Sequence, residues 1–190
     1  MSELILVEQL MVPVEEYARV GEDATLFEAI MALEDAQENQ DREHLKYLHR
    51  AVLVTESGGD RVVGKISQLI AIQALEPKYK DIGDLRTISA AGFSTDFIQS
   101  MMENFRLCDT SLKEVCSKGA SIKVKDFMQK PEPGEFVEAD ADICVAIHQF
   151  IIGQHQSLLV LENKEIVGIL RLTDVFMKIF KLMKQCTISE

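Results

Sequence analysis

Apolar and polar positions along the chain alternate in the same order twice. Apolar residues at spacings of three and four predict a helix with one buried face, and short apolar runs on either side of a polar turn predict a β-hairpin. The first series predicts a strand at 18–20, a helix that buries Leu26, Ile30 and Leu33, strands at 51–55 and 61–67 around the turn 57–60, and a closing helix at 68–75.

The second series repeats the first. It predicts a strand at 136–137, a helix that buries Ile143, Ile147 and Phe150, strands at 158–161 and 166–170 around the turn 162–165, and a closing helix at 173–183. Without a gap, Val7 aligns with Val124, Met11 with Met128 and Asp23 with Asp140; further on, 51–54 aligns with 157–160 and 62–64 with 166–168. One supersecondary unit therefore occurs twice. We expect an α+β fold in which two β-α-β-β-α repeats pack as a pseudo-twofold pair.

Asp23 and Asp140 stand just before the first helix of each repeat. A carboxylate at this point can accept a hydrogen bond from an unpaired amide of the first turn. We therefore expect both aspartates to be helix N-caps.

The repeats divide the chain into three parts. We assign 3–75 to a first domain, whose first helix is lengthened by the charged segment at about 35–48. Residues 121–184 form a second domain. The segment 76–122 between them is too long for a bare loop and is expected to be a helical insert, with one helix from Ser94 to Phe105 and another at 109–118, ended by Gly119.

The formal net charge of −11 disfavours duplex nucleic acid and anionic membranes as partners. Lys178, Lys181 and Lys184 form the densest basic group, and we interpret them as a solvated helix face near a helix C-terminus. The apolar runs are too short to span a membrane, and the start of the chain does not resemble a secretory signal. We expect a cytoplasmic protein that binds neither nucleic acid nor membrane.

The titratable residues lack the pattern of a catalytic or metal site. The four cysteines have no C-x-x-C spacing, so we expect reduced, mostly buried thiols. His44 and His49 lie five positions apart, which is not the spacing of two ligands on one helix face. No nucleophile–base pair or phosphate-binding loop is evident. We expect that the chain is not an enzyme and requires no cofactor.

The repeated element order, together with VGKISQLI (63–70) and VGILRLTDVF (167–176), resembles the CBS domain family over 3–75 and 121–184. The resemblance implies that the two copies pack through their sheets into one unit, often called a Bateman module. In this family, clefts between paired domains bind adenosine compounds such as AMP, ATP or S-adenosylmethionine. Binding alters the conformation of an attached or partner protein.

The family's ligand motif is a glycine, two apolar residues, Ser or Thr, two variable residues and Asp. In the second repeat, Gly168 and Asp174 match, and Arg171 replaces the hydroxyl residue. In the first repeat Ser67 matches, but Ile70 replaces the aspartate. The resemblance implies that Asp174 accepts hydrogen bonds from the ribose hydroxyls, so we expect binding mainly at the second motif.

The resemblance also places Thr173, Val137, His155, Gln156 and Lys130 around the same ligand. Two roles stay open. Asp174 is either the ribose ligand or only a helix cap, and Arg171 either contacts phosphate as a forked donor or forms a surface salt bridge.

The function expected from the resemblance is that of a regulatory module. It binds AMP, ADP, ATP or S-adenosylmethionine, forms a homodimer and signals to a separate effector protein. The alternative is a ligand-free scaffold that dimerises and presents the central insert to a partner.

Overall fold

The structure is a computed structural model and describes residues 4–39, 48–82, 92, 94–107 and 109–188. The strands are β1 (Val12–Pro13), β2 (Arg19–Gly21), β3 (Ala51–Thr55), β4 (Val62–Ser67), β5 (Phe136–Glu138), β6 (Ser157–Glu162) and β7 (Glu165–Arg171). The helices are α1 (Leu26–Glu38), α2 (Gln68–Ala74), α4 (Thr95–Asn104), α5 (Leu112–Gly119), α6 (Ile143–Gly153) and α7 (Leu172–Ile188). The expected α+β fold with two β-α-β-β-α repeats is confirmed.

The strands form two sheets, one for each repeat. The first repeat contributes a three-stranded sheet of order β2-β3-β4, and the second contributes β5, β6 and β7 to a four-stranded sheet of order β1-β7-β6-β5. In both repeats the first strand runs parallel to the second, and the hairpin strands are antiparallel. The hairpin turn of the second repeat places Asn163 and Lys164 at positive φ, as a tight two-residue turn requires.

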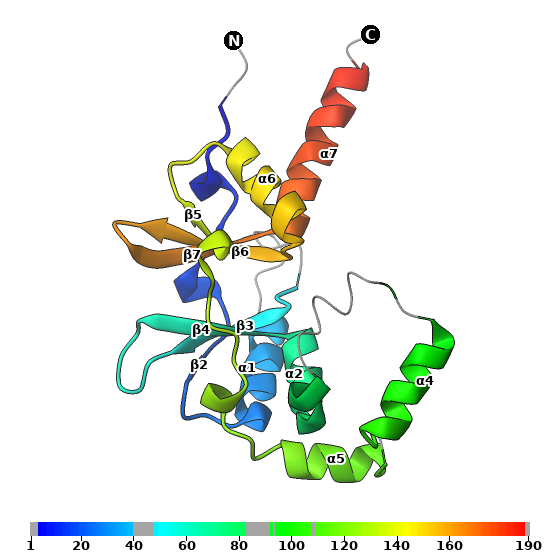
Figure 1. The fold of residues 1–190 in the computed structure, drawn as a ribbon. Helices are drawn as coiled ribbons and strands as arrows, with labels where there is room; N and C mark the ends of the chain where they lie inside the picture. The colour runs from blue at the N-terminus through cyan, green and yellow to red at the C-terminus, as the bar shows by residue number, and fades with distance from the viewer. Residues whose placement is uncertain (1–3, 40–47, 83–91, 93, 108, 189–190) are drawn as a thin grey trace.

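The layers follow the order helix, sheet, sheet, helix (Figure 1). Three buried clusters hold them together. The central cluster joins the two sheets and consists of Val12, Val14, Tyr17, Ala51, Leu53, Val62, Leu159 and Ile169. The other two lie beneath the helices of each repeat, with Leu158, Leu170 and Phe150 under α6 and α7, and Val52, Ile66 and Ala29 against α1 and α2. The pair of repeats therefore shares one core.

The segments that precede each repeat are exchanged. The Val7 amide donates to the Ala141 carbonyl (3.0 Å), and the aligned Val124 amide donates to the Ala24 carbonyl (2.8 Å). Val7 is fully buried in the core of the second repeat, whereas Val124 is fully buried in the core of the first. Residues 5–12, which we assigned to the first domain, thus complete the second, and residues 122–129 complete the first.

The exchange continues along the sheet edges at two aligned glycines. β1 pairs antiparallel with β7, with Pro13 opposite Gly168. A Cβ at Gly168 would lie 2.7 Å from Met11 Sδ and 2.8 Å from the Val12 carbonyl oxygen. At Gly64 the corresponding distances are 2.8 Å to Met128 Sδ and 3.1 Å to the Gln129 carbonyl oxygen. A side chain at either position would push the exchanged segment off its sheet.

The expected N-caps are wrong by two residues in both repeats. α1 is capped by Thr25, whose hydroxyl accepts from the Glu28 amide while the Glu28 carboxylate accepts from the Thr25 amide. This reciprocal box satisfies two donors, which a lone carboxylate at Asp23 cannot do. In the second repeat Asp142 accepts from the Cys144 amide (2.8 Å), so Asp140 is not the cap.

Two expectations about burial are also wrong. Ile30 is 46% exposed, because the buried face of α1 is centred on Leu26 and Ala29 instead. Cys116 and Cys144 are free and exposed, since both lie on outward faces of their helices. Cys108 and the side chain of Cys186 lie outside the described part of the chain.

The insert contains the two expected helices. Ser94 caps α4 by accepting from the Phe97 amide, as expected. α5 begins at Leu112 and is capped by Ser111, because Asp109 binds Arg106 instead. α1 ends at Glu38 with Asn39 as its C-cap, and the rest of its expected extension, at 40–47, lies outside the described residues.

We expect Gly168→Ala to lower the free energy of unfolding by about 1–3 kcal/mol, because the new methyl group meets a backbone oxygen that strand pairing holds in place. Chemical denaturation measures the loss. Gly21→Ala is the matched control, since a Cβ at Gly21 meets nothing within 4 Å; its effect should stay within about 1 kcal/mol. Equal effects of the two substitutions would contradict the close approach at Gly168.

Candidate functional site

Arg171 and Asp174 form a closed pair where β7 passes into α7. Arg171 Nε donates to Asp174 Oδ2 (2.5 Å) and Arg171 Nη2 donates to Asp174 Oδ1 (2.9 Å). Arg171 is the last residue of β7, and Asp174 lies in the first turn of α7. Only 8% of the Arg171 side chain and 16% of the Asp174 side chain is exposed. The fork of the guanidinium therefore matches both carboxylate oxygens in a largely dry setting.

Tyr17 and His49 from the first repeat lie within electrostatic reach of this pair. Their rings meet edge to face with centroids 4.3 Å apart, and both residues are buried. Within the described part of the chain, His49 Nδ1 has no hydrogen-bond partner. We call Tyr17, His49, Arg171 and Asp174 the Asp174 cluster; it joins the two repeats.

The aromatic members of the Asp174 cluster are held neutral. Burial, reinforced by the charge of Arg171, lowers the pKa of His49 to about 4, although Asp174 and a hydrogen bond to the Glu16 backbone act in the opposite direction. Burial raises the pKa of Tyr17 to about 12, with Arg171 opposing. Near pH 7 the cluster thus contains one cation and one anion, each the other's partner, beside two neutral rings.

The other sequence-predicted residues have varied surroundings. Gly168 is buried under Met11, Val137 is buried in the core of the second repeat, Thr173 is half-buried in the first turn of α7, and Lys130 is exposed. Gln156 is exposed, and its carbonyl accepts from the Leu172 amide (3.0 Å) at the start of α7. Of the predicted set, Arg171 and Asp174 are joined by direct side-chain hydrogen bonds. Arg171 is thus in a salt bridge, but a largely buried one, and Asp174 lies inside the first turn of α7 and not at its N-cap.

His155 belongs to a second buried cluster, together with Lys65, Gln129 and Glu135, which we call the Glu135 cluster. Lys65 Nζ lies 2.9 Å from Glu135 Oε1, with 8% and 3% of the two side chains exposed. Gln129 Nε2 donates to the same oxygen (2.9 Å), and His155 Nδ1 lies 3.8 Å from it. Burial alone would raise the pKa of Glu135, but the hydrogen bond and charge of Lys65 keep that pKa below its ordinary value.

The two clusters occupy related positions in the repeats. His155 aligns with His49, and Lys65 aligns with the buried Ile169. In the first repeat, where Ile70 replaces the aspartate, Ser67 caps α2 by accepting from the Ile70 amide (3.3 Å). A buried ion pair between the repeats therefore lies on the side that lacks the ribose aspartate.

Tyr17 and His49 are members of the Asp174 cluster that were not predicted from the sequence. The spacing of His49 from His44 bears only on metal binding. Extending the alignment of 51–54 with 157–160 by two residues places His49 on His155, which is one of the predicted ligand-binding residues. Tyr17 aligns with Gly134, which is not a predicted ligand-binding residue, so the alignment does not indicate Tyr17.

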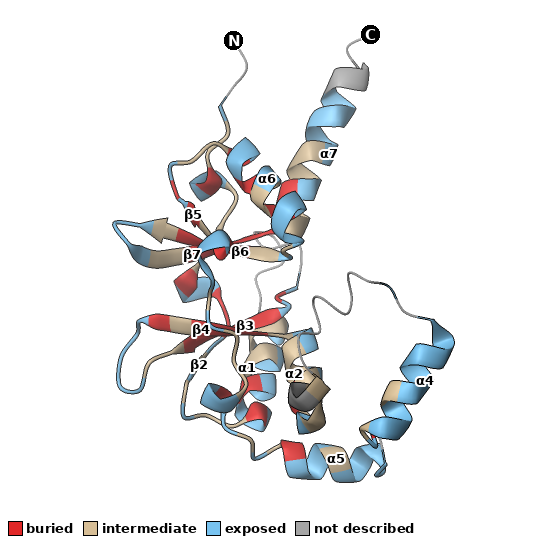
Figure 2. Cartoon of the chain, in the orientation of Figure 1, coloured by how far each residue is buried: buried red, intermediate tan, exposed pale blue. Residues whose placement is uncertain are grey.

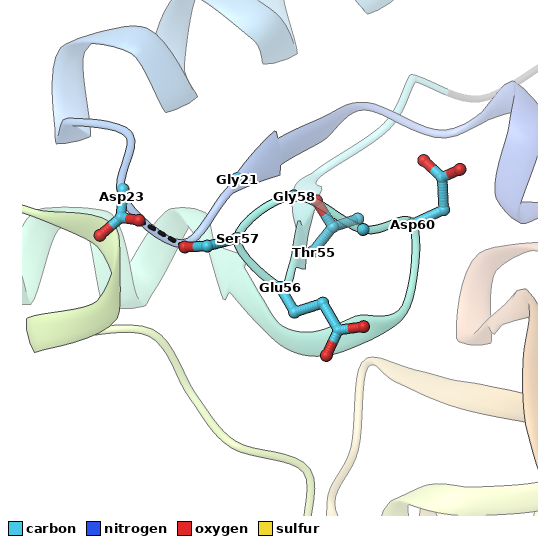
Figure 3. Close-up of a pocket in the computed structure, with 8 residues that line it drawn as sticks. Gly21, Asp23, Thr55, Glu56, Ser57, Gly58 and Asp60 are labelled. Atoms are coloured by element: carbon cyan, nitrogen blue, oxygen red, sulfur yellow. Dashed lines mark hydrogen bonds between the residues drawn. The ribbon is translucent and has the colours of Figure 1, made fainter.

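A hollow of about 410 Å³ lies at the β3–β4 turn and is bordered by Gly21 and Asp23 (Figure 3). Asp23 accepts hydrogen bonds from Ser57 and, over 2.8 Å, from Lys125 Nζ. Asp23, Glu56 and Asp60 line the hollow. Their charge disfavours phosphate, so this hollow does not suit a nucleotide.

Across the described ranges, no three His, Cys, Asp or Glu side chains are grouped so that they could hold a metal ion. None of the described helices combines the length and apolar character that a membrane span requires.

We expect His49 to make the protein less stable as the pH falls from 7 to 5. The unfolded chain binds a proton at His49 near pH 6.5, but the folded chain does so only near pH 4. Stability is therefore lost below pH 6.5, by about 2 kcal/mol between pH 7 and pH 5. Urea unfolding at both values measures it, and His49→Phe should reduce the loss by that amount. An unchanged loss in the variant would contradict a neutral buried His49.

We expect Lys65→Met to destabilise the fold by about 3 kcal/mol or more, because Glu135 is left charged and buried. Lys65→Met/Glu135→Gln removes both charges but keeps an acceptor for Gln129, so it should recover most of the loss. Chemical denaturation of both variants tests this. A single variant no worse than the double variant would show that the ion pair does not carry a buried charge.

Comparison with known proteins identifies one domain by sequence and the fold of the chain by structure. The family model described as "CBS domain" matches residues 124–181. A CBS domain-containing protein of unknown function from Bacillus anthracis str. Ames Ancestor is similar in structure, with 16% identity and a TM-score of 0.59 over 93% of this chain and 94% of that one. A putative acetoin utilization protein (AcuB) from Vibrio cholerae has 15% identity and a TM-score of 0.57 over 99% of both chains.

A third similar structure is that of CBSX2 in complex with AMP, with 15% identity and a TM-score of 0.55 over 94% of this chain and 98% of that one. No curated protein sequence matches the chain. At these identities the solved structures show only that the fold is shared, whereas the family model identifies residues 124–181, within the second repeat, by sequence. The exchanged segments and paired sheets make the first repeat its structural counterpart. Residues 124–181 are thus a CBS domain, and the chain as a whole has the paired-repeat fold of CBS-domain proteins.

Proposed function

We propose that the chain is a regulatory module, not a catalyst, and that it binds an adenine nucleotide at the Asp174 cluster. The observation that carries the proposal is that Asp174, at the ribose position of the family motif, shares its buried cluster with His49 Nδ1, an acceptor that has no hydrogen-bond partner in the described structure. AMP in the similar CBSX2 structure supports the choice of ligand class.

Binding exchanges partners within the cluster. The ribose hydroxyls donate to Asp174, and Arg171 turns from the carboxylate to the phosphate, so each charge leaves one partner for another. Neutral His49 offers Nδ1 as an acceptor for a ligand donor. The ligand thereby satisfies a buried polar atom that has no hydrogen-bond partner in the described structure.

This exchange favours charged nucleotides. Adenosine can replace Arg171 on Asp174 but offers no phosphate to the guanidinium, so a buried cation loses its carboxylate partner without gaining another anion. S-adenosylmethionine also lacks a phosphate. We therefore propose AMP, ADP or ATP ahead of S-adenosylmethionine.

The cluster suits a sensor because it joins the repeats. Arg171 and Asp174 come from the second repeat, whereas Tyr17 and His49 come from the first, so a bound nucleotide changes how the two are held together. On the opposite side of the repeat pair, the Lys65–Glu135 ion pair of the Glu135 cluster holds the two repeats together. We propose that the change is read by a separate effector protein, that the chain acts as a homodimer, and that it does so in the cytoplasm.

A ligand-free scaffold is the second candidate. The closed Arg171–Asp174 pair favours it, because a carboxylate that already accepts two hydrogen bonds from its own chain does not need a ribose. Nucleotide binding decides between the two candidates.

We expect AMP, ADP or ATP to raise the thermal midpoint, because a ligand that binds only the folded state stabilises it. At about ten times its Kd the gain is about 1.4 kcal/mol, or about 3–5 °C for a chain of this size. Asp174→Asn should abolish the shift, measured by differential scanning fluorimetry against each variant's own ligand-free midpoint.

Ile70→Ala is the matched control, since it changes the aligned position of the first repeat, and its shift should equal that of the unmodified chain. If none of the three nucleotides shifts the midpoint at millimolar concentration, the sensor proposal fails and the scaffold stands. A shift that survives Asp174→Asn would place the ligand elsewhere.

A further inference from the structure

Four polar groups face the carboxylate of Glu135. Lys65 Nζ and Gln129 Nε2 each lie 2.9 Å from Oε1, and His155 Nδ1 lies 3.8 Å from the same oxygen. The Glu132 amide donates to Oε2 over 3.1 Å. Both carboxylate oxygens are thus held, and only 3% of the Glu135 side chain is exposed. A buried set of donors around one carboxylate is the arrangement of an anion-binding site.

Backbone contacts that do not involve Glu135 hold these groups in place. Lys65 and Gln129 pair through both of their backbone amides, over 3.0 Å each. The His155 amide donates to the Phe150 carbonyl (3.2 Å) at the end of α6, and the His155 ring fills the space where a Cβ of Gly153 would stand. The polar groups are therefore positioned independently of the carboxylate that they surround.

The Glu135 carboxylate comes from a segment that is otherwise exposed. This segment crosses from the edge of the first sheet, where Gln129 pairs with Lys65, to the start of β5 in the second (Figure 1). Residues 130–134 are mostly exposed (Figure 2), whereas Glu135 is buried. The Glu135 side chain is thus the anchor of this segment.

The fold itself does not require charge at this place. The residues aligned with Lys65, Gln129 and Glu135 in the other repeat are all apolar and buried, namely Ile169, Val12 and Ala18. Because a buried ion pair contributes no more stability than well-packed apolar side chains, the fold alone does not account for it. The polar groups of the Glu135 cluster therefore suit the binding of an anion.

We propose that the Glu135 cluster is a carboxylate-binding site whose occupant is the chain's own Glu135 side chain. A tethered carboxylate is present at an effective concentration on the order of millimolar or above, so a free anion competes poorly with it. While Glu135 is in place, the site is closed to outside anions, nucleotide phosphates included. The inference does not depend on nucleotide binding at the Asp174 cluster.

Removal of the occupant opens the site. In Glu135→Ala the Lys65 ammonium keeps its position, where 8% of the side chain is exposed, but loses the carboxylate beside it. A buried cation without a partner is costly, so an anion that fits the vacated space is bound. Formate fits because it reproduces the carboxylate that the substitution removes.

Rescue by formate tests the proposal. At about ten times the formate Kd, we expect sodium formate to raise the thermal midpoint of Glu135→Ala by about 3–5 °C more than sodium chloride of equal ionic strength. Differential scanning fluorimetry measures the midpoints. The unmodified chain should show no such difference between the two salts, because Glu135 already fills the site.

Two variants are matched controls. Lys65→Met/Glu135→Ala removes the cation as well as the occupant, so formate and chloride should act alike on it. Glu138→Ala removes a carboxylate from an exposed position of β5, and we expect no difference between the salts there either.

Each outcome decides the matter. Formate that stabilises Glu135→Ala no more than chloride does overturns the proposal. An equal formate effect in the unmodified chain or in a control variant also overturns it, because formate then binds elsewhere. If Glu135→Ala is unfolded in chloride, circular dichroism in formate decides: recovered structure supports the site, and a chain that stays unfolded contradicts it. None of these results alters the nucleotide test at Asp174.

Discussion

The exchange of the segments that precede each repeat, 5–12 and 122–129, is the constraint on which the rest of the structure depends. Each repeat lacks one edge of its sheet and one wall of its core until the segment before the other repeat supplies them. Gly64 and Gly168 make this possible, because the exchanged backbone passes where a Cβ would stand. Neither repeat is complete alone, so the two sheets are held face to face.

The exchange also decides what stands beside Asp174. The backbone that leaves β1 runs through Tyr17 and brings it, with His49, against the end of β7 and the start of α7. In the same way, the exchange places His155 beside Lys65 and Glu135 on the opposite side of the repeat pair. The exchange thus produces two clusters of different chemistry. The Glu135 cluster contains an ion pair between the repeats, and the Asp174 cluster contains an ion pair within the second repeat. Only the second contains the aspartate on which our functional proposal rests.

Much of this could be predicted from the sequence because local patterns are strong. Alternation and helical spacing gave the strands and helices, and the aligned Met11 and Met128 marked the repeat. The N-cap of α1 was predicted wrongly because only carboxylates were considered, whereas Thr25 caps the helix and gains a reciprocal partner in Glu28. The pairing of Arg171 with Asp174 was missed because the salt bridge of Arg171 was expected at the surface, with no partner identified. Contacts between repeats, such as Lys65 with Glu135, depend on an exchange that no local pattern encodes.

Our central claim is that a nucleotide takes the place of the internal pair at the Asp174 cluster. A crystal structure of the chain grown with millimolar ADP tests it most directly. The account predicts ribose hydroxyls on Asp174, Arg171 turned to the phosphates, and His49 Nδ1 in contact with the ligand. An intact Arg171–Asp174 pair, with the nucleotide bound elsewhere or not at all, would contradict it.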